Sequence, residues 1–387
     1  MFRINYRNHS QRTSNKVRAM LTIVFMAYSF CYIFILQSDM LAYLQHVLSE
    51  GHTTYNRLVG SLIVVFLVFI IHAAVSAITR LPEKLYAFTF LPSALFLAVL
   101  TDLIADYSLC KLLIYLAVLV LTVLLYIKTA NSASSQRRKS DSSSVYISNV
   151  LILCIMMVVV GLCGNSNDKQ HYELKMERLL NESKYEEAVK VGAKSLVSSE
   201  LLTCLRAFAL SKSGLLGEKM FEYPVTSTEN ALLIPRKDST HMIFHPDNIY
   251  KYLGAFPGET STSYQFLHLI SSQPDLLKSR PQIKDYLLTT ALLRKNLDLF
   301  ASEIKRFYDF SDSTLVLPKH YGEALVLYSH LRTKPKVTYN NTLTETNYKD
   351  FVEFSEKYKD RLTRANAVRQ HYGDTYWWFY YYGKVCK

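Results

Sequence analysis

The residues best suited to chemistry in the first part of the chain lie in one short polar stretch between two apolar segments. Its carboxylate, amide, imidazole, phenol and guanidinium groups belong to Asp39, Gln45, His46, Tyr55, Asn56 and Arg57. A loop does not need this set of groups merely to turn, so they predict a polar site, which Asp102 and Asp106 can join. A nucleophile paired with a general base cannot be identified among them. We therefore favour a docking surface for the C-terminal half over a catalytic site.

Histidines offer two further candidates. His241 and His245 have the i, i+4 spacing of metal ligands on a helix, but Pro246 follows directly and no carboxylate is suitably placed. Because zinc sites take three or four protein ligands, we predict no metal and no other cofactor. His72 lies inside an apolar segment, where an ionisable group is a functional hypothesis. We interpret it as a neutral histidine bonded to a neighbouring helix.

The last candidate is a run of rings near the C-terminus. Eight of the eleven positions from Tyr372 to Tyr382 are aromatic, and the run includes both tryptophans, Trp377 and Trp378. Such a run suits a membrane-interface belt, because Trp and Tyr favour that boundary. It also suits a stacking platform for sugar or peptide, or simple core packing. We favour core packing, with part of the run left exposed.

Five apolar segments are long enough to cross a bilayer, which takes about 20 residues. They are residues 18–36, 58–78, 85–104, 111–129 and 147–163. The third contains Pro92 and is expected to be kinked there. Between the first two, residues 39–51 predict a short amphipathic helix that begins at Asp39 and ends at Gly51, lying on the membrane surface or against the spans.

Charge divides the chain and orients it. The first 164 residues carry 19 charged side chains and the remaining 223 carry 57, which places a boundary near Asn165. Eleven Lys and Arg residues lie in the N-terminal tail and the second and fourth loops, against two in the first and third. By the positive-inside rule the N-terminus is cytoplasmic. The predicted parts are a basic tail (1–17), a transmembrane domain (18–164) and an extracytoplasmic domain (165–387).

The C-terminal half has helical periodicity almost throughout, so the predicted fold is all-α: a bundle of about five spans followed by a helical solenoid. Residues 183–216 resemble a tetratricopeptide repeat, with a turn, Tyr185 and Ala188 on one helix, Ala207 on the next and Gly214 at a further turn. Small residues at such positions let two helices approach closely. Further helical hairpins are expected at 285–307 and 320–331, and a single long helix at 347–371.

Four stretches carry a wider family resemblance. They are Gln37 to Arg57, Phe90 to Asp102, Leu215 to Phe221, and Tyr372 to Trp378. Together they resemble an uncharacterised family of Bacteroidota inner-membrane proteins with a tetratricopeptide-like extracytoplasmic half. The resemblance implies an inner-membrane location with the C-terminal domain in the periplasm, and it implies no catalytic residue.

These observations predict a non-enzymatic scaffold that binds a protein or peptide partner in the cell envelope and the lipid bilayer itself. The basic residues are not clustered on one face with interleaved aromatics, so nucleic acid is not an expected partner. The alternative is a membrane enzyme, such as an envelope glycan or lipid transferase, that uses the first outer loop. Cys204 and Cys386 would both face an oxidising compartment, and we favour two unpaired thiols over a disulfide.

The charge bias makes a direct prediction of topology. Alkaline phosphatase fused after Asn165 should be active, because it would fold outside the cytoplasm, and the same enzyme fused within residues 131–146 should be inactive. Activity assays on cells that express each fusion measure this. The reverse pattern would contradict both the orientation and the compartment of the C-terminal half.

Overall fold

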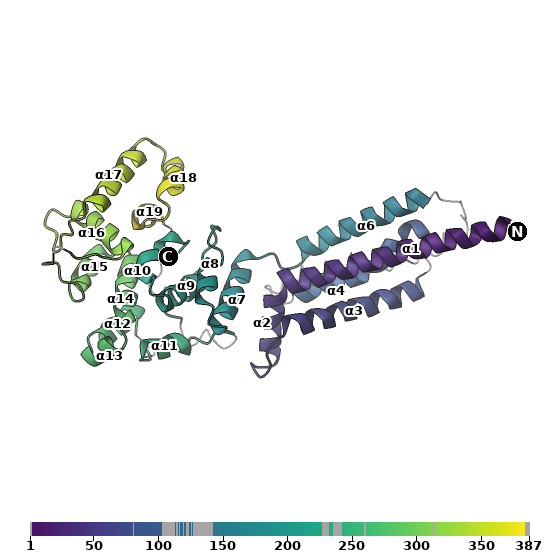
Figure 1. Cartoon of the computed structure of the whole chain (residues 1–387), viewed down its shortest axis with the longest axis horizontal. Helices are drawn as coiled ribbons and strands as arrows, with labels where there is room; N and C mark the ends of the chain where they lie inside the picture. Colours follow the sequence, from purple (N-terminus) through teal and green to yellow (C-terminus); the bar gives the residue numbers. More distant parts are fainter. Residues whose placement is uncertain are drawn as a thin grey trace. The chain divides into compact units, whose positions relative to one another are not determined.

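The structure is a computed structural model with two compact units, Met1–Asn167 and Asp168–Lys387. It describes residues 2–79, 81–102, seven positions between 113 and 126, and residues 142–226, 232–234, 242–258, 261–312 and 314–383. Every regular element within these ranges is a helix (Figure 1). The expectation of an all-α chain is confirmed for this part of the sequence.

The first unit contains long apolar helices that lie side by side (Figure 1). Its elements are α1 (Phe2–Cys31), η1 (Tyr32–Leu36), α2 (Ser38–Leu48), α3 (Arg57–Ile78), η2 (Glu83–Phe90), α4 (Leu91–Asp102) and α6 (Ser142–Cys163). Helix α1 continues into one turn of π-helix, η1, and η2 is a 3₁₀-helix that runs directly into α4.

Four of these helical segments are long and apolar enough to cross a membrane. They are Asn15–Leu36, Arg57–Ile78, Glu83–Asp102 and Ser143–Cys163. Each coincides with one of the predicted spans, whereas the predicted span at 111–129 lies largely outside the described residues. Pro92 stands at the second position of α4, at the junction with η2. Proline is tolerated in the first turn of a helix, where its missing N–H would lack a partner anyway.

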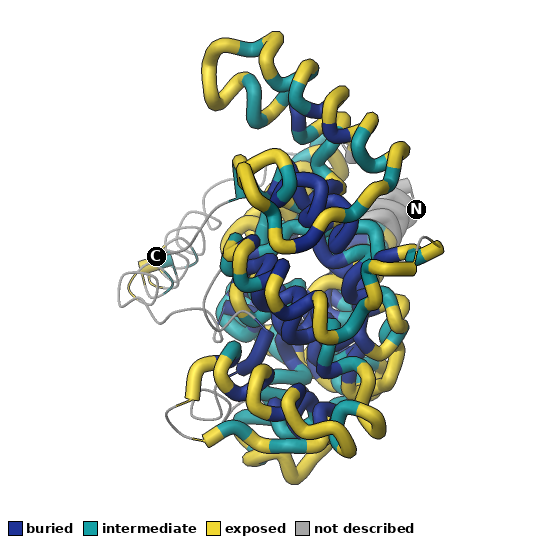
Figure 2. Tube along the Cα trace, turned by 90° about the vertical axis from the view of Figure 1, so that its left-hand side faces the viewer, coloured by how far each residue is buried: buried dark blue, intermediate teal, exposed yellow. Residues whose placement is uncertain are grey.

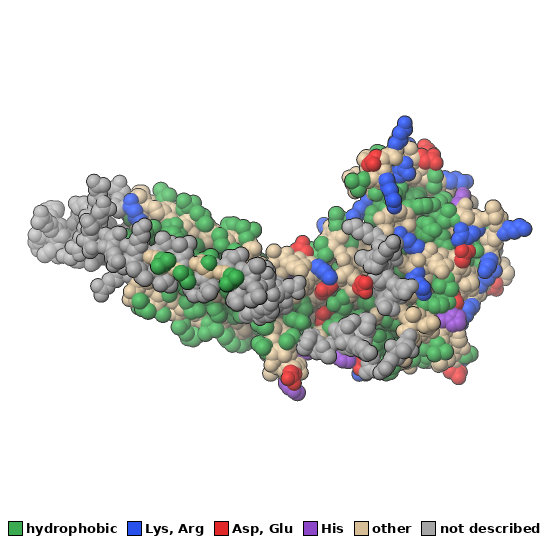
Figure 3. Space-filling model, turned by 180° about the vertical axis from the view of Figure 1, so that it is seen from behind, with side chains coloured by type: hydrophobic (Ala, Val, Ile, Leu, Met, Phe, Trp, Pro, Cys, Tyr) green, Lys and Arg blue, Asp and Glu red, His purple; other side chains and the backbone are tan. Residues whose placement is uncertain are grey.

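The polarity of α3 is inverted relative to a helix of a water-soluble protein. Its buried positions include Ser61 and His72, while Leu62, Phe66 and Ile70 are exposed. Figure 3 shows many hydrophobic side chains on those parts of this unit's visible face that are described. A surface of this kind is stable where the solvent is lipid, so the exposed side chains of α3 agree with the hydropathy of the sequence.

Asn149 of α6 completes the backbone bonding of the 3₁₀ segment η2. Its side chain accepts from the Ala87 amide at 2.7 Å and donates to the Glu83 carbonyl at 2.8 Å, and it is fully buried. Such bonds matter in a span because an unsatisfied backbone group in lipid costs several kcal/mol, on the order of 3 or more. One polar residue in an apolar helix thus stabilises a non-α segment of its neighbour.

The second unit is a succession of shorter helices. They are α7 (Asp168–Asn181), α8 (Tyr185–Lys190), α9 (Glu200–Lys212), α10 (Leu216–Lys219), η3 (Met220–Glu222), α11 (Asp247–Leu253), α12 (Ser263–Ser271), α13 (Pro274–Ser279), α14 (Gln282–Leu293), α15 (Leu297–Ile304), α16 (Lys319–Leu331), α17 (Thr342–Glu356), α18 (Arg361–Tyr372) and α19 (Tyr376–Tyr382). From α14 onward each helix packs against the next one along the chain. The core runs continuously through this unit, and the tube in Figure 2 is buried along its middle.

The predicted close approach at residues 183–216 is present. Helices α8 and α9 pack together, and Ala188 and Ala207 are fully buried between larger side chains. Gly214 has a φ of +69°, a left-handed conformation that suits glycine at the turn after α9.

The single long helix expected at 347–371 is wrong. Helix α17 ends at Glu356, α18 begins at Arg361, and the two helices form a hairpin. The reason is the Asp360 side chain, which accepts from the Thr363 amide at 2.8 Å and caps a new helix. An aspartate at this position stabilises a helix start by about 1 kcal/mol.

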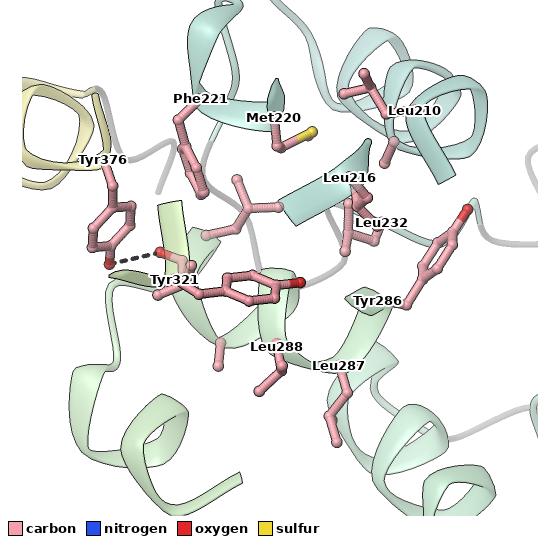
Figure 4. Close-up of a cluster of buried hydrophobic side chains, with 14 of the residues drawn as sticks. Leu210, Leu216, Met220, Phe221, Leu232, Tyr286, Leu287, Leu288, Tyr321 and Tyr376 are labelled. Atoms are coloured by element: carbon pink, nitrogen blue, oxygen red, sulfur yellow. Dashed lines mark hydrogen bonds between the residues drawn. The ribbon is translucent and has the colours of Figure 1, made fainter. Parts of the chain in front are cut away.

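The aromatic run forms α19 and closes the core. Tyr376, Trp377 and Phe379 are at most 2 % exposed, whereas Tyr381 is 38 % exposed. Tyr376 donates its hydroxyl to the Leu292 carbonyl at 3.2 Å and packs beside Phe221 (Figure 4). Three of the eight rings therefore belong to the core, four others pack against it, and Tyr381 is exposed.

Several buried carboxylates bind backbone amides of distant segments. Glu177 of α7, only 2 % exposed, accepts from the amides of Ile243 and Phe244 at 2.8 and 3.1 Å. Burial raises the pKa of Glu177 to about 7, although these two amides oppose the shift. Because the folded state holds its proton more tightly than the unfolded state, the stabilisation is present at low pH and is lost as the pH rises through about 7.

This pKa predicts how the stability of the second unit depends on pH. Between pH 5 and pH 8, Glu177 should lower the free energy of unfolding of the segment 168–387 by up to about 3 kcal/mol. Glu177→Gln keeps an acceptor for the two amides and should flatten the profile, while the exposed control Glu186→Gln should not. Urea titrations at a series of pH values measure the difference, and identical slopes in Glu177→Gln and wild type would contradict the assignment.

Candidate functional site

The first polar stretch joins three helices of the first unit. The Arg57 guanidinium donates from Nε to the Ser38 hydroxyl at 2.8 Å and also reaches the Phe34 carbonyl at 3.3 Å. It lies over the Phe34 ring, with 5.6 Å between Cζ and the ring centroid. Arg57 therefore ties the end of η1 and the start of α2 to the start of α3.

The neighbouring polar side chains shape the turn between α2 and α3. Asn56 caps α3 by accepting from the Leu58 and Val59 amides at 3.0 and 3.1 Å. Gln45 donates to the Thr53 hydroxyl at 2.9 Å. His46 packs against Gly51, whose φ of +79° needs glycine where α2 ends. The amphipathic helix expected at 39–51 is thus present as Ser38–Leu48, with Asp39 in its first turn and Gln37 at its cap position.

Asp39, Tyr55 and Arg57 lie within electrostatic reach of one another. Burial raises the pKa of Tyr55, Arg57 opposes that shift, and Asp39 adds to it. The Tyr55 ring lies directly on Gly60, where any larger residue would clash with it. The structure therefore brings these members of the predicted site together at the start of α3, where they hold the turn in place.

Asp102 belongs to a different group, which we call the polar cluster. Its members come from η1, α4, the segment after α4 and the residue that follows η1. They are Tyr32, Gln37, Thr101, Asp102 and Tyr115. The first four are at most 9 % exposed. Asp106, the other predicted member of the first site, lies outside the described residues.

The cluster holds the stretch that leads out of α6. Gln37 donates from its amide nitrogen to the Asn165 carbonyl at 3.1 Å and to the Tyr32 hydroxyl at 3.3 Å. The Tyr32 hydroxyl lies 3.2 Å from the Thr101 hydroxyl, which itself donates to carbonyls of α4. Gln37 Oε1 is buried without a hydrogen-bond partner among the described residues, so the cluster retains one acceptor for a further polar group.

Asp102 and Tyr115 are joined by a hydrogen bond. The Tyr115 hydroxyl lies 3.2 Å from Asp102 Oδ2 and 2.9 Å from the Cys163 carbonyl. Tyr115 therefore links Asp102, the last residue of α4, to Cys163, the last residue of α6, next to the π-turn. Single π-turns are frequent at functional sites.

An apolar groove of about 360 Å³ opens beside the first polar stretch. It lies between α2 and α3, and Leu100 of α4 also contributes. The other lining residues are Leu41, Leu44, Gln45, Leu48, Ser49, Tyr55, Gly60, Ile63 and Val64. Its walls suit an alkyl chain, with the polar groups of Gln45 and Ser49 at one side.

The other residues singled out in the sequence include two histidine candidates and two cysteines. His72 stacks on Phe90, with 3.9 Å between ring centroids, and its Nε2 lies 3.3 Å from the Tyr86 hydroxyl. His241 lies outside the described residues, and the residues that the structure does describe contain no group of three or more potential metal ligands. Cys204 is a buried free thiol, and Cys386 also lies outside the described ranges.

The two tryptophans have different environments. Trp377 is 1 % exposed and donates from its indole nitrogen to the Glu323 carbonyl at 2.8 Å. Trp378 is half-buried and donates to the Ala365 carbonyl at 3.1 Å, with Arg369 stacked on its ring at 5.1 Å. Of the two tryptophans, only Trp378 is partly exposed.

Sequence reasoning missed Tyr32, Gln37 and Tyr115. Tyr32 and Gln37 could have been found, because an amide at the end of an apolar span, five residues after a tyrosine, needs a buried partner. Tyr115 lies within the fourth predicted span, and its pairing with Asp102 depends on a fold that the sequence pattern does not specify.

Within the part of the chain that the structure describes, fold and site define a helical protein with four apolar helices that could cross a membrane. Comparison with known proteins places the chain in a family: it belongs to DUF6057, described as a family of unknown function, whose model matches residues 112–278 and 276–383. The match covers most of the second unit and agrees with the expected uncharacterised family. No curated protein and no solved structure matches the chain.

The polar cluster makes a prediction about Gly164. A methyl group there would collide with the Tyr32 hydroxyl and come within 2.9 Å of the Thr101 hydroxyl. Gly164→Ala should therefore lower the thermal stability of the full-length protein in detergent, by about 1 to 3 kcal/mol.

Two variants make this test specific. Gly161→Ala is the matched control, because its added methyl meets no atom within 4 Å. Tyr32→Phe removes the colliding hydroxyl, so the Gly164→Ala, Tyr32→Phe double variant should be more stable than the two separate losses predict. Equal melting temperatures for Gly161→Ala and Gly164→Ala would contradict the packing described here.

Proposed function

We propose that this protein is a multi-pass protein of the bacterial inner membrane whose second unit is a periplasmic scaffold for a protein or peptide partner. The observation that carries the proposal is the order of packing in the second unit. Helices α14 to α19 contact one another in sequence, as successive elements do in helical-repeat proteins. Such stacks expose long surfaces built from many helices, and these surfaces commonly bind proteins or peptides.

The orientation is supported by the charge bias of the short loops, with eleven cations against two. The resemblance of residues 183–216 to a tetratricopeptide repeat supports the same kind of scaffold. The buried alanines of α8 and α9 fit that interpretation.

The first polar stretch favours a structural role over catalysis. Asn56 caps a helix, Arg57 binds a hydroxyl and a carbonyl, and Gln45 binds the loop. These bonds occupy the groups that the alternative, a glycan or lipid transferase, would need for its chemistry. We therefore propose that this region supports the protein's architecture.

Photocrosslinking in native membranes tests the scaffold. A photoreactive residue in place of exposed Leu269 or Tyr381, both in the second unit, should form a saturable adduct with one protein partner. The same residue in place of Phe66, on the exposed apolar face of α3, should crosslink to lipid. Lipid or no adduct at every position of the second unit would contradict the proposal.

A further inference from the structure

The α17–α18 hairpin divides its charges between its two helices. Helix α17 carries four acidic residues and one lysine, whereas α18 carries three arginines and no acidic residue. Lys357 and Lys359 in the connection add to the basic side. Figure 3 shows Lys or Arg side chains together with Asp or Glu side chains on the projecting part of the second unit. The basic residues of the hairpin therefore lie mainly on α18 and in the connection that precedes it.

The basic side of α18 faces the half-buried rings of α19. Arg369 stacks on Trp378 at 5.1 Å, and Trp378 donates to the Ala365 carbonyl. Arg364 donates from Nε to the Tyr358 carbonyl at 2.7 Å. Because this acceptor is neutral, the bond does not cancel the positive charge of Arg364. Arginines of α18 and rings of α19 thus meet at the junction of the two helices.

A third element brings another cation to the same place. Lys295, in the turn between α14 and α15, donates from Nζ to the Gly383 carbonyl at 2.9 Å. Burial lowers the pKa of Lys295, and repulsion from Arg361 lowers it further. Burial raises the pKa of Tyr382, and Arg364 and Arg361 oppose that shift. Arg361 and Arg364 therefore lie near Tyr382, and Lys295 lies near Arg361 and over the Phe379 ring, 5.2 Å from its centroid.

Three acidic residues in this part of the second unit have partners within the protein. The Asp360 carboxylate accepts from the amide and the hydroxyl of Thr363, both at 2.8 Å. Asp298 pairs with Arg332 at 2.7 Å, and Asp374 pairs with Lys319 at 2.8 Å. The junction therefore has a net positive charge.

We propose that this junction, formed by Lys295, Arg361, Arg364, Arg369, Trp378 and Tyr382, binds an acidic, extended peptide segment of the partner protein. The proposal rests on the scaffold function proposed above and names its binding surface. Arg361 and Arg369 are eight residues apart, which is about 12 Å along a helix. An extended chain advances about 3.3 Å per residue, so a segment of about four residues spans both arginines with its carboxylates.

The rings distinguish this partner from a sugar and from a membrane. A sugar stacks on an open aromatic face, but Trp378 is half-buried and Arg369 covers one face of its ring. A membrane anchor projects its rings into the bilayer, but Trp378 is half-buried and its N–H is already bonded within the protein. An acidic peptide needs neither an open aromatic face nor projecting rings. Its carboxylates pair with the arginines while its backbone lies along the junction.

Fluorescence anisotropy with full-length protein in zwitterionic nanodiscs tests the proposal. The probe is a labelled ten-residue peptide of alternating Glu and Ser, and the control peptide alternates Lys and Ser. We expect saturable binding of the acidic peptide alone, weakened by added salt. Arg361→Gln with Arg369→Gln should weaken it at least tenfold, while Lys334→Gln with Lys349→Gln, an equal loss of charge at exposed positions away from the junction, should change it less than twofold.

Other outcomes overturn the proposal. Equal weakening by the two double variants would reveal a non-specific charge effect. Tighter binding of oligogalacturonate, or of phosphatidylglycerol vesicles, with the same dependence on Arg361 and Arg369 would assign the surface to a glycan or a membrane. Photocrosslinking separates this surface from the scaffold function: partner adducts at Leu269 but not at Tyr381 refute only the junction, whereas no adduct at either position refutes both.

Discussion

The second unit depends on one buried carboxylate, that of Glu323 in α16. It is 4 % exposed, and it binds α19 directly and η3 through His320, a neighbour on its own helix. Its Oε2 accepts from the His320 ring at 2.9 Å and from the Tyr376 amide, the first of α19, at 2.7 Å. His320 in turn accepts the Phe221 amide on Nε2 at 3.3 Å, which fixes the neutral tautomer with its proton on Nδ1. One carboxylate therefore orients η3, α16 and α19 around a common point.

Carboxylates that accept hydrogen bonds from backbone amides occur at several places in the second unit. A buried carboxylate is costly unless hydrogen bonds compensate it, and a helix start offers amides without partners. Glu323 serves α19, Glu218 accepts from the Lys319 amide at the start of α16, and Glu177 serves the segment before α11. Arg206 is the cationic counterpart: it is fully buried and donates to the carbonyls of Val191 and Pro224. Each of these side chains forms hydrogen bonds with backbone amides or carbonyls that have no partner within a regular helix.

The sequence predicted those parts of the fold that depend on local pattern. Hydropathy located the span at 58–78, which in the structure begins at Arg57 because Asn56 caps it. The break between α17 and α18 was also readable, since Asp360 precedes Thr363 by three residues, but the apolar spacing on both sides concealed it. The buried pairs of polar residues, in contrast, could not be predicted from the sequence. His320 and Glu323 have the spacing of an exposed polar face, and only the arrival of α19 from more than fifty residues further on makes them core residues.

The same limit applies to the sites. Asp39, Arg57 and Asp102 were grouped because all three precede or follow spans, but their side-chain bonds place Asp102 with Tyr115 instead. The grouping at the basic junction depends on Lys295, which comes from a turn between two other helices. Neither group has a local sequence pattern, because its members meet only after helices distant in the chain have packed.

The position of α19 has a consequence for how the protein is made. Its side chains bond to groups 54 and 84 residues earlier, and those groups lie in the middle of the core. While the chain is still emerging from the ribosome, the parts of α14 and α16 that α19 covers remain exposed. Chaperones and proteases would therefore meet an incomplete core until the aromatic residues of α19 are made. A chain truncated before α19 would keep those apolar faces exposed.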